Sequence, residues 1–437
     1  MRTPRRSTHK IWGVLLSAAG LLHCGSSTRA AASLHAAVAV EGVEAEEEQE
    51  QEVVPSAAAR LPVSVDTLAQ GPLPARMANE GWHGGGTSHV QTLGGQHTIT
   101  GTLRGDWDTS SALLVVYNRH WQAAIQRLLA FAHDDLPVYV LATPRDARSR
   151  AFRRWARRVP FAGLVSMALD TPWIRDYGPM ELQTNGEISW LDLVYAPEDR
   201  PRDNAMPGLL SEVFQTPQQA EPQLNLEGGG IISNGEGLCG MTEASLLELG
   251  LAGAGEEQWA SFLQTIGCRT LARLPELPSE ATGHADMLAQ FLSPHQVAIA
   301  VPTDDSPPDV TEALLGARLA LTQAAEAHGQ ALEFVELPLV NREELYYSYV
   351  NGLRTPSHYF VPSYSAVDPA VQALVHRRLE QALEGVRVIG VDSDEMIENG
   401  GAIHCVTLGL KHPLLPRLDR ASGRGTGASK LARLSHR

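Results

Sequence analysis

Short apolar runs, each typical of a buried strand, constrain the fold of this chain more than any other feature. The run at 112–117 (ALLVVY) is continuously apolar, and Trp121, Ile125, Leu128 and Ala132 follow it at helical spacing. The same succession recurs along the chain: strands are predicted at 112–117, 138–142, 161–167, 188–195, 231–241, 287–292, 297–301, 332–339, 359–364, 386–391 and 403–408, and helices at 121–132, 145–158, 256–266, 309–328 and 369–383. Strands outnumber helices by about two to one, which predicts an α/β protein but fits a simple parallel Rossmann sheet poorly.

Composition and charge narrow the class of protein. With 437 residues and 43% hydrophobic content, the chain is globular and can bury one large core or two moderate ones. The formal net charge of -15 argues against nucleic acid as the main partner and suits a cationic substrate. Four cysteines are too few for a disulfide-built scaffold, so any disulfide is expected to be incidental. Cys239 and Cys268 are expected to be packed thiols that activity does not need.

The first residues are expected to direct export. Residues 1–24 combine a basic start with an apolar run at 11–22 that is too short to span a membrane, as in a signal peptide. Cys24 lies in a Leu-Leu-His-Cys-Gly sequence that resembles a bacterial lipoprotein cleavage box, although His23 occupies a position where a small residue is usual. The mature protein is therefore expected in the cell envelope or secreted, with membrane contact only through a lipid on Cys24.

Composition divides the remainder into three parts. Residues 25–76 are rich in Ala, Glu, Gln and Pro without an apolar period, which predicts a disordered acidic linker. Residues 77–410 carry the strand and helix signals and are expected to form the functional domain. Residues 411–437 are rich in Gly, Ser and Arg, which predicts a disordered basic tail.

Four polar clusters fall at predicted strand ends or in the loops after them. They are 173–179 (WIRDYGP), 226–230 (LEGGG), 282–286 (TGHAD) and 398–407 (ENGGAIHCVT). The last cluster places Cys405 just inside an apolar run, after an Asn-Gly-Gly turn that lets the backbone approach a ligand closely. A lone cysteine there is more often a buried structural thiol. Together with the other clusters, Cys405 instead indicates a nucleophile for a cationic substrate.

These four clusters, in this order and at these separations, resemble the bacterial peptidylarginine deiminase and agmatine deiminase family of the guanidine-modifying (pentein) enzymes. The similarity covers 173–407. It implies a pentein α/β propeller of five ββαβ-type units around a pseudo-fivefold axis, with the site at the centre. Such a fold would explain both the excess of strands and the convergence of residues that are distant in sequence.

The chemistry of a guanidinium group gives each residue type a role. Its carbon is a poor electrophile because the cation is delocalised, so hydrolysis needs a strong nucleophile, fixed counter-charges and a proton donor for ammonia. Cys405 can supply a thiolate, and by resemblance Asp176 and Asp286 hold the guanidinium through charge-assisted hydrogen bonds. If its segment is extended, His284 faces the same ligand as Asp286 and serves as general acid and base. By resemblance, Glu227 orients His284.

No cofactor and no metal are expected. His284, Asp286 and Glu227 are an alternative set of metal ligands, but no second histidine stands at metal-ligand spacing near them. Without the other clusters, the His-x-Asp pair would more often be a surface hydrogen bond, and Glu227 a turn residue.

Weaker signals concern the substrate. Asn351, in the sequence SYVNG, is similar to a family residue beside the catalytic cysteine, and the alternative is an ordinary turn residue. Trp173 is expected to line the substrate site. Arg200 and Arg202, in the sequence RPRDN, resemble the loop with which secreted peptidylarginine deiminases bind the carboxylate of a C-terminal arginine. The alternative is a solvated turn.

These features predict an exported hydrolase that converts arginine, free or at a peptide C-terminus, to citrulline and ammonia through a covalent thiouronium intermediate. Its partners would be arginine-containing peptides or small guanidino substrates, and its oligomeric state stays open. The alternatives are an agmatine deiminase that forms N-carbamoylputrescine, an amidinotransferase, and a non-catalytic lipoprotein that binds guanidino compounds. Agmatine has no carboxylate, so the Arg200 and Arg202 pair counts against the first alternative. The export signal also counts against it.

Overall fold

The computed structural model describes residues 64–65, 99–195, 199–251, 256–342 and 345–411. The predicted export signal with Cys24, the predicted tail beyond residue 411 and almost all of the predicted linker lie outside these residues. Within the predicted linker, Ser64–Val65 form strand β1 and pair in parallel with β5 (Gly163–Ser166). These two residues are therefore ordered where disorder was predicted.

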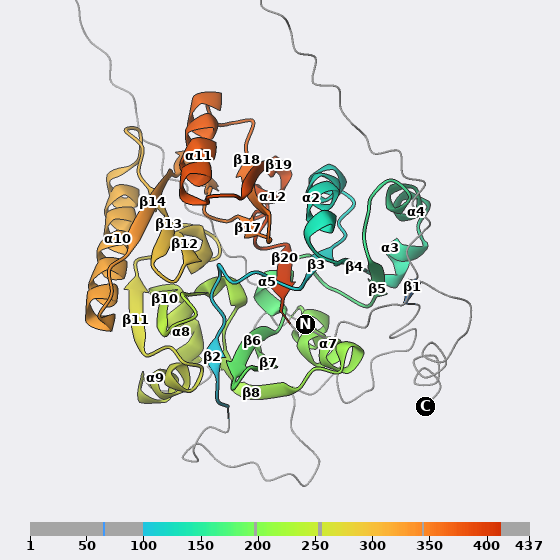
Figure 1. The fold of residues 1–437 in the computed structure, drawn as a ribbon, viewed down its shortest axis with the longest axis horizontal. Coiled ribbons are helices and arrows are strands. Elements are labelled where there is room, and N and C mark those ends of the chain that lie inside the picture. The colour runs from blue at the N-terminus through green and yellow to red at the C-terminus, as the bar shows by residue number, and fades with distance from the viewer. Residues whose placement is uncertain (1–63, 66–98, 196–198, 252–255, 343–344, 412–437) are drawn as a thin grey trace, which may run out of the picture. The chain divides into compact units, whose positions relative to one another are not determined.

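Five blades built on one strand pattern surround a common centre (Figure 1). In every blade an inner strand pairs antiparallel with the next strand, which pairs in parallel with a third strand. Helices connect the two parallel strands, because a parallel pair needs a long crossover connection. This is a ββαβ unit repeated five times, and the predicted propeller is confirmed.

The first three blades follow one another along the chain. The first contains β6 (Met180–Thr184), β7 (Glu187–Val194), α6 (Pro201–Asn204), α7 (Met206–Phe214) and β8 (Gln218–Asn225), with β2 (Thr102–Leu103) beside β6. The second contains the 3-10 helix η1 (Gly228–Gly230), β9 (Ile231–Ser233), β10 (Leu238–Thr242), α8 (Glu243–Leu251), α9 (Glu256–Thr265) and β11 (Thr270–Leu274). The third contains the 3-10 helix η2 (Ala285–Met287), β12 (Ala289–Ser293), β13 (Gln296–Val301), α10 (Pro308–His328) and β14 (Glu333–Pro338), and the hairpin β15 (Val340–Arg342) and β16 (Leu345–Tyr347) follows it.

The last two blades close the ring. The fourth contains β17 (Leu353–Arg354), β18 (His358–Ser363), α11 (Pro369–Ala382) and β19 (Arg387–Asp392). The fifth contains α12 (Asp394–Ile397), β20 (Thr407–Leu410), β3 (Ala112–Val116), α2 (Gln122–Asp135), β4 (Val138–Ala142), α3 (Pro144–Arg148), α4 (Arg150–Ala156) and β5. Its inner strand β20 pairs antiparallel with β3, so strands from opposite ends of the domain complete this blade.

The longer helices that connect parallel strands, such as α2, α7, α10 and α11, lie on the outside of the ring (Figure 1). The buried residues of α2 recur at the spacing of an amphipathic helix: Ala124, Ile125, Leu128, Leu129 and Ala132. Core clusters join neighbouring blades, and one of them contains both Leu141 of the fifth blade and Trp190 of the first. Among the described helices, none combines the length and the apolar content needed to cross a bilayer.

Several predicted elements differ from the observed ones. The single strand predicted at 231–241 is a hairpin, β9 and β10, because Gly235 and Gly237 turn the chain with φ of 74° and 102°. The helix predicted at 145–158 is divided into α3 and α4 by Ser149, whose Oγ caps α4. The short strands β2, β6, β11 and β15 to β17, the polar strand β8 and helices α6 to α8 were not predicted.

Candidate active site

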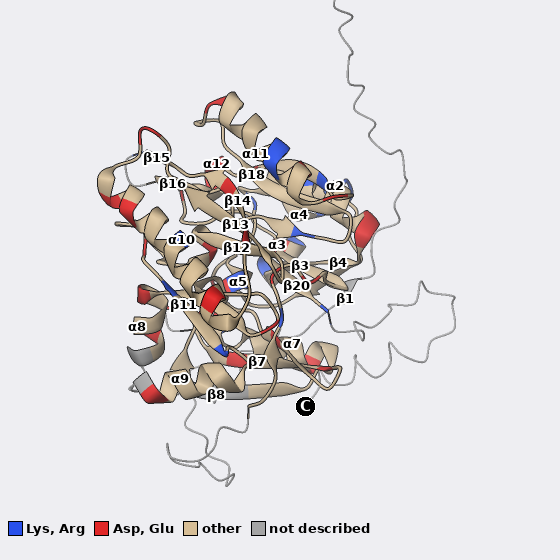
Figure 2. Cartoon of the chain, turned by 60° about the vertical axis from the view of Figure 1, so that its left-hand side comes forward, with Lys and Arg blue, Asp and Glu red and all other residues tan. Residues whose placement is uncertain are grey.

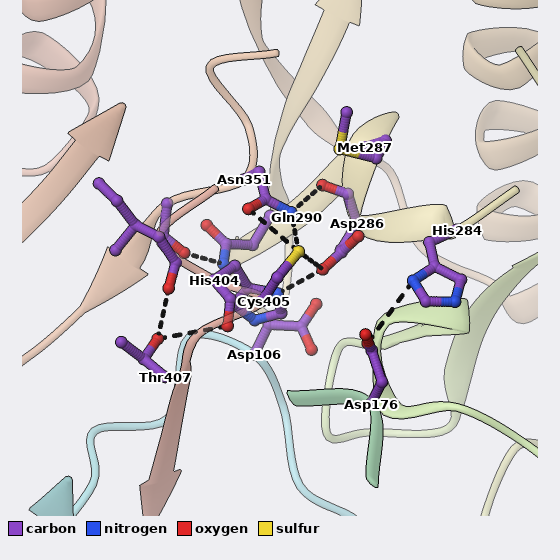
Figure 3. Close-up of polar contacts among 12 residues, drawn as sticks. Asp106, Asp176, His284, Asp286, Met287, Gln290, Asn351, His404, Cys405 and Thr407 are labelled. Carbon is purple, nitrogen blue, oxygen red and sulfur yellow. Dashed lines mark hydrogen bonds and ion pairs between the residues drawn. The ribbon is translucent and has the colours of Figure 1, made fainter. Parts of the chain in front are cut away.

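Each of the five passages that lead into an inner strand carries at least one polar residue of the predicted site, and the passage before β12 carries both His284 and Asp286. Asp176 lies in α5 (Ile174–Tyr177) before β6, Glu227 before η1 and β9, Asp286 in η2 before β12, Asn351 before β17 and Cys405 before β20. Because the inner strands surround the centre of the ring, their side chains converge there. Figure 3 shows four of these residues together, with the Cys405 sulfur between Asn351 and Asp286.

Cys405 lies in a turn at 403–406 and not in the strand predicted at 403–408. The backbone N–H of His404 donates to the carbonyl of Asn351 at 3.2 Å, so pairing with β3 begins only at Thr407. Cys405 is 3% exposed. Its Sγ accepts from Asn351 Nδ2 at 3.4 Å and lies 3.9 Å from Asp286 Oδ2. The turn therefore directs the thiol to a carboxylate and an amide from two other blades.

Three polar groups surround Gly229 closely. A Cβ at this glycine would lie 2.5 Å from His284 Nδ1, 2.8 Å from Asp176 Oδ1 and 3.2 Å from Asp286 Oδ2, so a side chain here would displace them. Asp176 Oδ1, His284 Nδ1 and Asp286 Oδ1 are buried and have no hydrogen-bond partner among the described residues. Such atoms carry a desolvation penalty that a ligand can remove. A cation with several N–H donors fits the two carboxylate oxygens.

His284 lies between two carboxylates. Its Nε2 is 3.1 Å from Glu227 Oε2, and its Nδ1 is 3.6 Å from Asp176 Oδ1. Burial lowers the pKa of His284, but Asp176, Glu227 and Asp286 outweigh burial and raise the pKa to about 10. The imidazole is therefore a cation at neutral pH, which suits a general acid. Glu227 lies within hydrogen-bond distance of His284, and its orienting role stays a prediction.

The segment after His284 is not extended as predicted. His284 itself is extended, with φ -80° and ψ 146°, but Ala285–Met287 form the 3-10 helix η2. Asp286 still reaches the same point as His284, because atoms of both side chains surround Gly229. The two residues thus face one ligand, but strand alternation is not the reason.

The two aspartates differ in charge. Burial raises the pKa of Asp176 to about 7, and the positive charge of His284 offsets this only in part. Burial acts in the same direction on Asp286, but the hydrogen bond from His404 and the charges of His284 and Arg175 hold its pKa below the usual range. Asp286 is thus ionised before a ligand arrives, while a bound cation would favour ionisation of Asp176.

The surroundings of Cys405 favour the neutral thiol. Burial raises the pKa of Cys405 well above its ordinary value, and the negative charges of Asp286 and Asp176 raise it further. The hydrogen bond from Asn351 acts in the opposite direction. A cation bound by the two aspartates would cancel the charges that oppose the thiolate, and would thereby lower the pKa of Cys405.

Asp176, Glu227 and His284 are the described residues whose ligand atoms are close enough together for a metal ion, all within 4.8 Å. This set contains Asp176 in place of the Asp286 that sequence analysis considered. Metal binding needs a neutral imidazole with a free lone pair. Both nitrogens of His284 face carboxylates that favour its protonated form. Chemistry without a metal therefore stays the prediction.

Trp173 borders the cysteine, as expected for a residue that lines the substrate site. A Cβ at Gly401 would lie 2.8 Å from Trp173 Cζ3 and 2.9 Å from Cys405 Sγ. The Trp173 ring also packs against Trp121, with 5.1 Å between centroids. Gly401 of the Asn-Gly-Gly segment thus leaves the space that the indole and the thiol share.

The two arginines predicted to bind a carboxylate have different partners. Arg202 donates to Asp170 twice, from Nη1 at 3.0 Å and from its backbone N–H at 2.8 Å. Arg200 Nη1 donates to the Tyr195 hydroxyl at 2.5 Å. Glu227 contributes to the raised pKa of Arg200, which places Arg200 within electrostatic reach of the site. The two guanidinium groups do not share a partner in this structure.

Cys239 and Cys268 form a disulfide, a pairing that the sequence left open. Cys239 lies in β10 and Cys268 just before β11, and these strands are parallel neighbours. Their Cα atoms are 5.6 Å apart although 29 positions separate them in the chain. The pairing depends on the crossover through α8 and α9, which the cysteine spacing alone does not reveal.

Three polar residues near the site were not predicted from the sequence. His404 Nδ1 lies 2.7 Å from Asp286 Oδ2. The backbone N–H of Arg175 donates to the Cys405 carbonyl at 3.1 Å, and the charge of Arg175 interacts with both Asp286 and Asp106. Burial raises the pKa of Asp106 to about 7. His404 and Arg175 belong to recognised clusters, so their position was a signal, whereas Asp106 is isolated in the sequence.

Comparison with known proteins agrees with this geometry. Residues 106–410 match the family model of the Porphyromonas-type peptidyl-arginine deiminases. Among curated proteins, one from Vibrio parahaemolyticus named "Putative agmatine deiminase" is 28% identical over an alignment of 283 residues that covers 56% of this chain and 76% of that protein. One of the same name from Streptomyces coelicolor is 28% identical over an alignment of 270 residues that covers 57% of this chain and 78% of that protein.

Solved structures show the same fold. Agmatine deiminase of Enterococcus faecalis superposes with a TM-score of 0.63 at 21% identity, covering 73% of this chain and 99% of that one. Agmatine deiminase of C. jejuni superposes with a TM-score of 0.61 at 20% identity, covering 71% of this chain and 96% of that one. The family match, which spans most of the described domain, and the propeller fold together show that this chain belongs to the Porphyromonas-type peptidyl-arginine deiminases, pentein-fold hydrolases that act on the C–N bonds of amidines.

Proposed function

We propose that this enzyme hydrolyses the guanidinium group of agmatine to N-carbamoylputrescine and ammonia. Both residues predicted to bind a substrate carboxylate, Arg200 and Arg202, already have partners within the protein. This supports agmatine as the substrate over free or peptide-bound arginine. Arg202 is bound to Asp170, and Arg200 to the Tyr195 hydroxyl. A substrate carboxylate would have to displace these partners, whereas agmatine carries no carboxylate. The names of the curated relatives point to the same substrate.

The charge of the site favours a dication. Asp176, Glu227 and Asp286 surround His284, and Glu248 of α8 lies near enough to Glu227 for their charges to interact. Acidic residues also occur along α8, α9 and α10 (Figure 2). Agmatine carries a guanidinium and an amine, both protonated at neutral pH, so both ends are attracted. The carboxylate of arginine would be repelled by the same residues.

Binding and activation of the thiol are coupled in this proposal. The guanidinium donates to Asp176 Oδ1 and Asp286 Oδ1, two buried oxygens that have no hydrogen-bond partner among the described residues. Its charge offsets that of both aspartates and lowers the pKa of Cys405. The thiol then releases its proton to solvent water, the thiolate forms beside the guanidinium carbon, and Asn351 Nδ2 holds the sulfur in place at 3.4 Å.

The reaction proceeds in two steps through one covalent intermediate. The sulfur attacks the guanidinium carbon, and the C–N bond to one terminal nitrogen breaks as protonated His284 gives that nitrogen a proton, releasing ammonia. Neutral His284 next takes a proton from water, and the resulting hydroxide attacks the carbon of the thiouronium. The C–S bond breaks, so the ureido product leaves and Cys405 is regenerated.

A second candidate substrate is arginine, free or at a peptide C-terminus. Arg200 favours it, because this residue lies within electrostatic reach of Glu227 and its side chain is 34% exposed. A carboxylate could bind to Arg200 if the Tyr195 hydrogen bond opened. The prediction that Arg200 and Arg202 act as a pair is part of this second candidate.

Export is part of the proposal. The disulfide between Cys239 and Cys268 supports it, because structural disulfides are rare in reducing compartments and common outside them. Separating cell fractions of a host that expresses the full chain would test this. Recovery of the protein in the cytoplasm with both thiols reduced would refute export.

The substrate is tested by kcat/KM for four compounds: agmatine, free arginine, and matched peptides that end in Arg-COOH or Arg-CONH₂. Ammonia and ureido product are both measured, and Cys405→Ser is the inactive control. We expect agmatine to exceed every other compound by at least about 30-fold, the ratio for roughly 2 kcal/mol. A higher kcat/KM for the Arg-COOH peptide, lost in Arg200→Ala, would establish the second candidate instead.

A further inference from the structure

We propose that His404 is a positioning residue for the reaction, which donates a hydrogen bond to Oδ2 of Asp286 and so leaves Oδ1 directed at the guanidinium. This inference rests on the proposed function of Asp286 as a ligand of the substrate cation. His404 is next to the nucleophile in the chain, yet its ring is directed at a carboxylate of another blade (Figure 3).

The contact is short, buried and fixed at both ends. His404 Nδ1 and Asp286 Oδ2 are 2.7 Å apart, and the two side chains are 8% and 1% exposed. The backbone of His404 is held by Asn351, whose carbonyl accepts its N–H at 3.2 Å, and by Thr407, whose N–H donates to its carbonyl at 3.2 Å. The imidazole therefore acts as a fixed donor and not as a mobile surface group.

The protonation state of the pair follows from its surroundings. An ionised carboxylate only accepts hydrogen bonds, so the proton of the contact lies on Nδ1 of His404. Burial lowers the pKa of His404, and the charge of Arg175 lowers it further, while Asp286 opposes both. The ring is thus neutral at physiological pH. It holds Asp286 by a directional hydrogen bond and adds no net charge that would repel a cationic substrate.

Only one oxygen of Asp286 is occupied. Oδ2 has the His404 contact, while Oδ1 is buried without a partner among the described residues. A carboxylate held at one oxygen cannot rotate freely, so the direction of the other oxygen is set before a ligand arrives. Positioning of this kind reduces the entropy lost on binding and fixes the geometry of attack.

The same contact affects the nucleophile. Oδ2 of Asp286 is also the oxygen that lies 3.9 Å from Cys405 Sγ, and its negative charge opposes formation of the thiolate. A hydrogen bond to this oxygen withdraws part of that charge. Loss of the His404 donor is therefore expected both to weaken binding of the cation and to make the thiol harder to ionise.

The surroundings of His404 distinguish this role from simple packing. His404 also lines a polar cavity of about 80 Å³ together with Arg104, Asp106, Arg175, Glu181 and Arg354. A histidine that served only to fill space would not need a donor toward Asp286. An apolar side chain of similar volume would then replace it without a kinetic effect.

The experiment compares His404→Asn with His404→Leu. The amide nitrogen of Asn lies near the position of Nδ1 and can still donate to Asp286, whereas Leu has similar bulk and no donor. Removing a hydrogen bond to a charged group is expected to lower kcat/KM by about 10-fold to 150-fold. We expect kcat/KM for the preferred guanidino substrate to fall by that factor in His404→Leu, mainly through KM, and His404→Asn to stay within about fivefold of wild type.

Two further measurements do not depend on turnover. The rate of Cys405 alkylation by iodoacetamide is followed against pH, and guanidinium chloride is titrated as a competitor of alkylation. His404→Leu should shift the alkylation profile to higher pH and weaken protection by guanidinium, and His404→Asn should restore both. Equal kinetics in the two variants, or changes that only follow a lowered Tm, would overturn the positioning role. These outcomes remain informative even if agmatine is not the substrate.

Discussion

Gly229→Ala places one methyl group at the point where the three catalytic side chains meet. Gly229 does not have the positive φ that disfavours side chains, so its backbone accepts alanine. The new Cβ would lie 2.5 Å from His284 Nδ1, 2.8 Å from Asp176 Oδ1 and 3.2 Å from Asp286 Oδ2. Ordinary non-bonded contacts are about 3.5 to 4.0 Å, so His284 has to retreat by about 1 Å.

The effect on catalysis should exceed the effect on stability. Displacement of a catalytic group by about 1 Å is worth on the order of 100-fold in rate. Overpacking costs about 1 to 3 kcal/mol, and part of it is avoided here because the neighbouring atoms line a ligand site and not a filled core. We therefore expect kcat/KM to fall by at least about 100-fold while the fold is retained.

Steady-state kinetics of ammonia release and denaturant unfolding measure the two effects. Gly208→Ala is the matched control, because its Cβ would lie 3.9 Å from the Gln218 side chain, an ordinary contact within helix α7. This control should leave kcat/KM unchanged and add about 0.5 to 1 kcal/mol of stability through helix propensity. If Gly229→Ala kept more than about a third of wild-type kcat/KM, the close approach of the three catalytic side chains to Gly229 would not be needed for catalysis.

Three other predictions follow from the charges and the disulfide. Asp176→Asn and Asp286→Asn should each lower kcat/KM by a factor on the order of 100, because each leaves an N–H edge of the guanidinium without its counter-charge; near-normal kinetics would mean that the substrate binds elsewhere. Replacing Cys239 and Cys268 together by Ala should lower the free energy of unfolding by about 3.5 kcal/mol with kcat/KM unchanged at 25 °C, and loss of activity in the folded variant would contradict this. The folded-state pKa of His284, about 10, exceeds the ordinary value, so its ion pairs stabilise fully below about pH 6.5 and lose their effect as the pH rises through about 10. The stability difference between wild type and His284→Gln should therefore narrow from pH 7 to pH 10, and a difference that widens would reverse the assignment.

Local signals in the sequence predicted an α/β protein rich in strands, whereas the five-bladed propeller and the roles of the site residues came from the resemblance to a known family. Long apolar strands such as β3 and β4 are visible as continuous runs, and the predicted clusters lie between the outer part of one blade and the inner strand of the next. The inner strands β9 and β17 have only three and two residues, too few for a periodic pattern. Their place in the ring depends on pairing with a neighbour, which a single strand does not encode.

Contacts between distant residues were the part that the sequence could not supply. The role of His404 depends on Asp286, 118 positions upstream, and the disulfide depends on a crossover that brings β10 next to β11. Cys405 illustrates a different limit. Its apolar neighbours favour a strand, but a backbone hydrogen bond from His404 to Asn351 keeps the cysteine in a turn.

The pairing of β20 with β3 determines when activity can first arise during synthesis. Ribosomes add about 5 to 20 residues per second, so roughly 15 to 60 s separate the emergence of β3 from that of β20. Until then the nascent chain contains Asp176, Glu227 and His284 but no nucleophile. A product that terminates before Thr407 would lack strand β20, which follows Cys405 and pairs with β3. The inner edge of β3 would then stay unpaired and prone to aggregation. Incomplete chains are therefore both inactive and prone to aggregation.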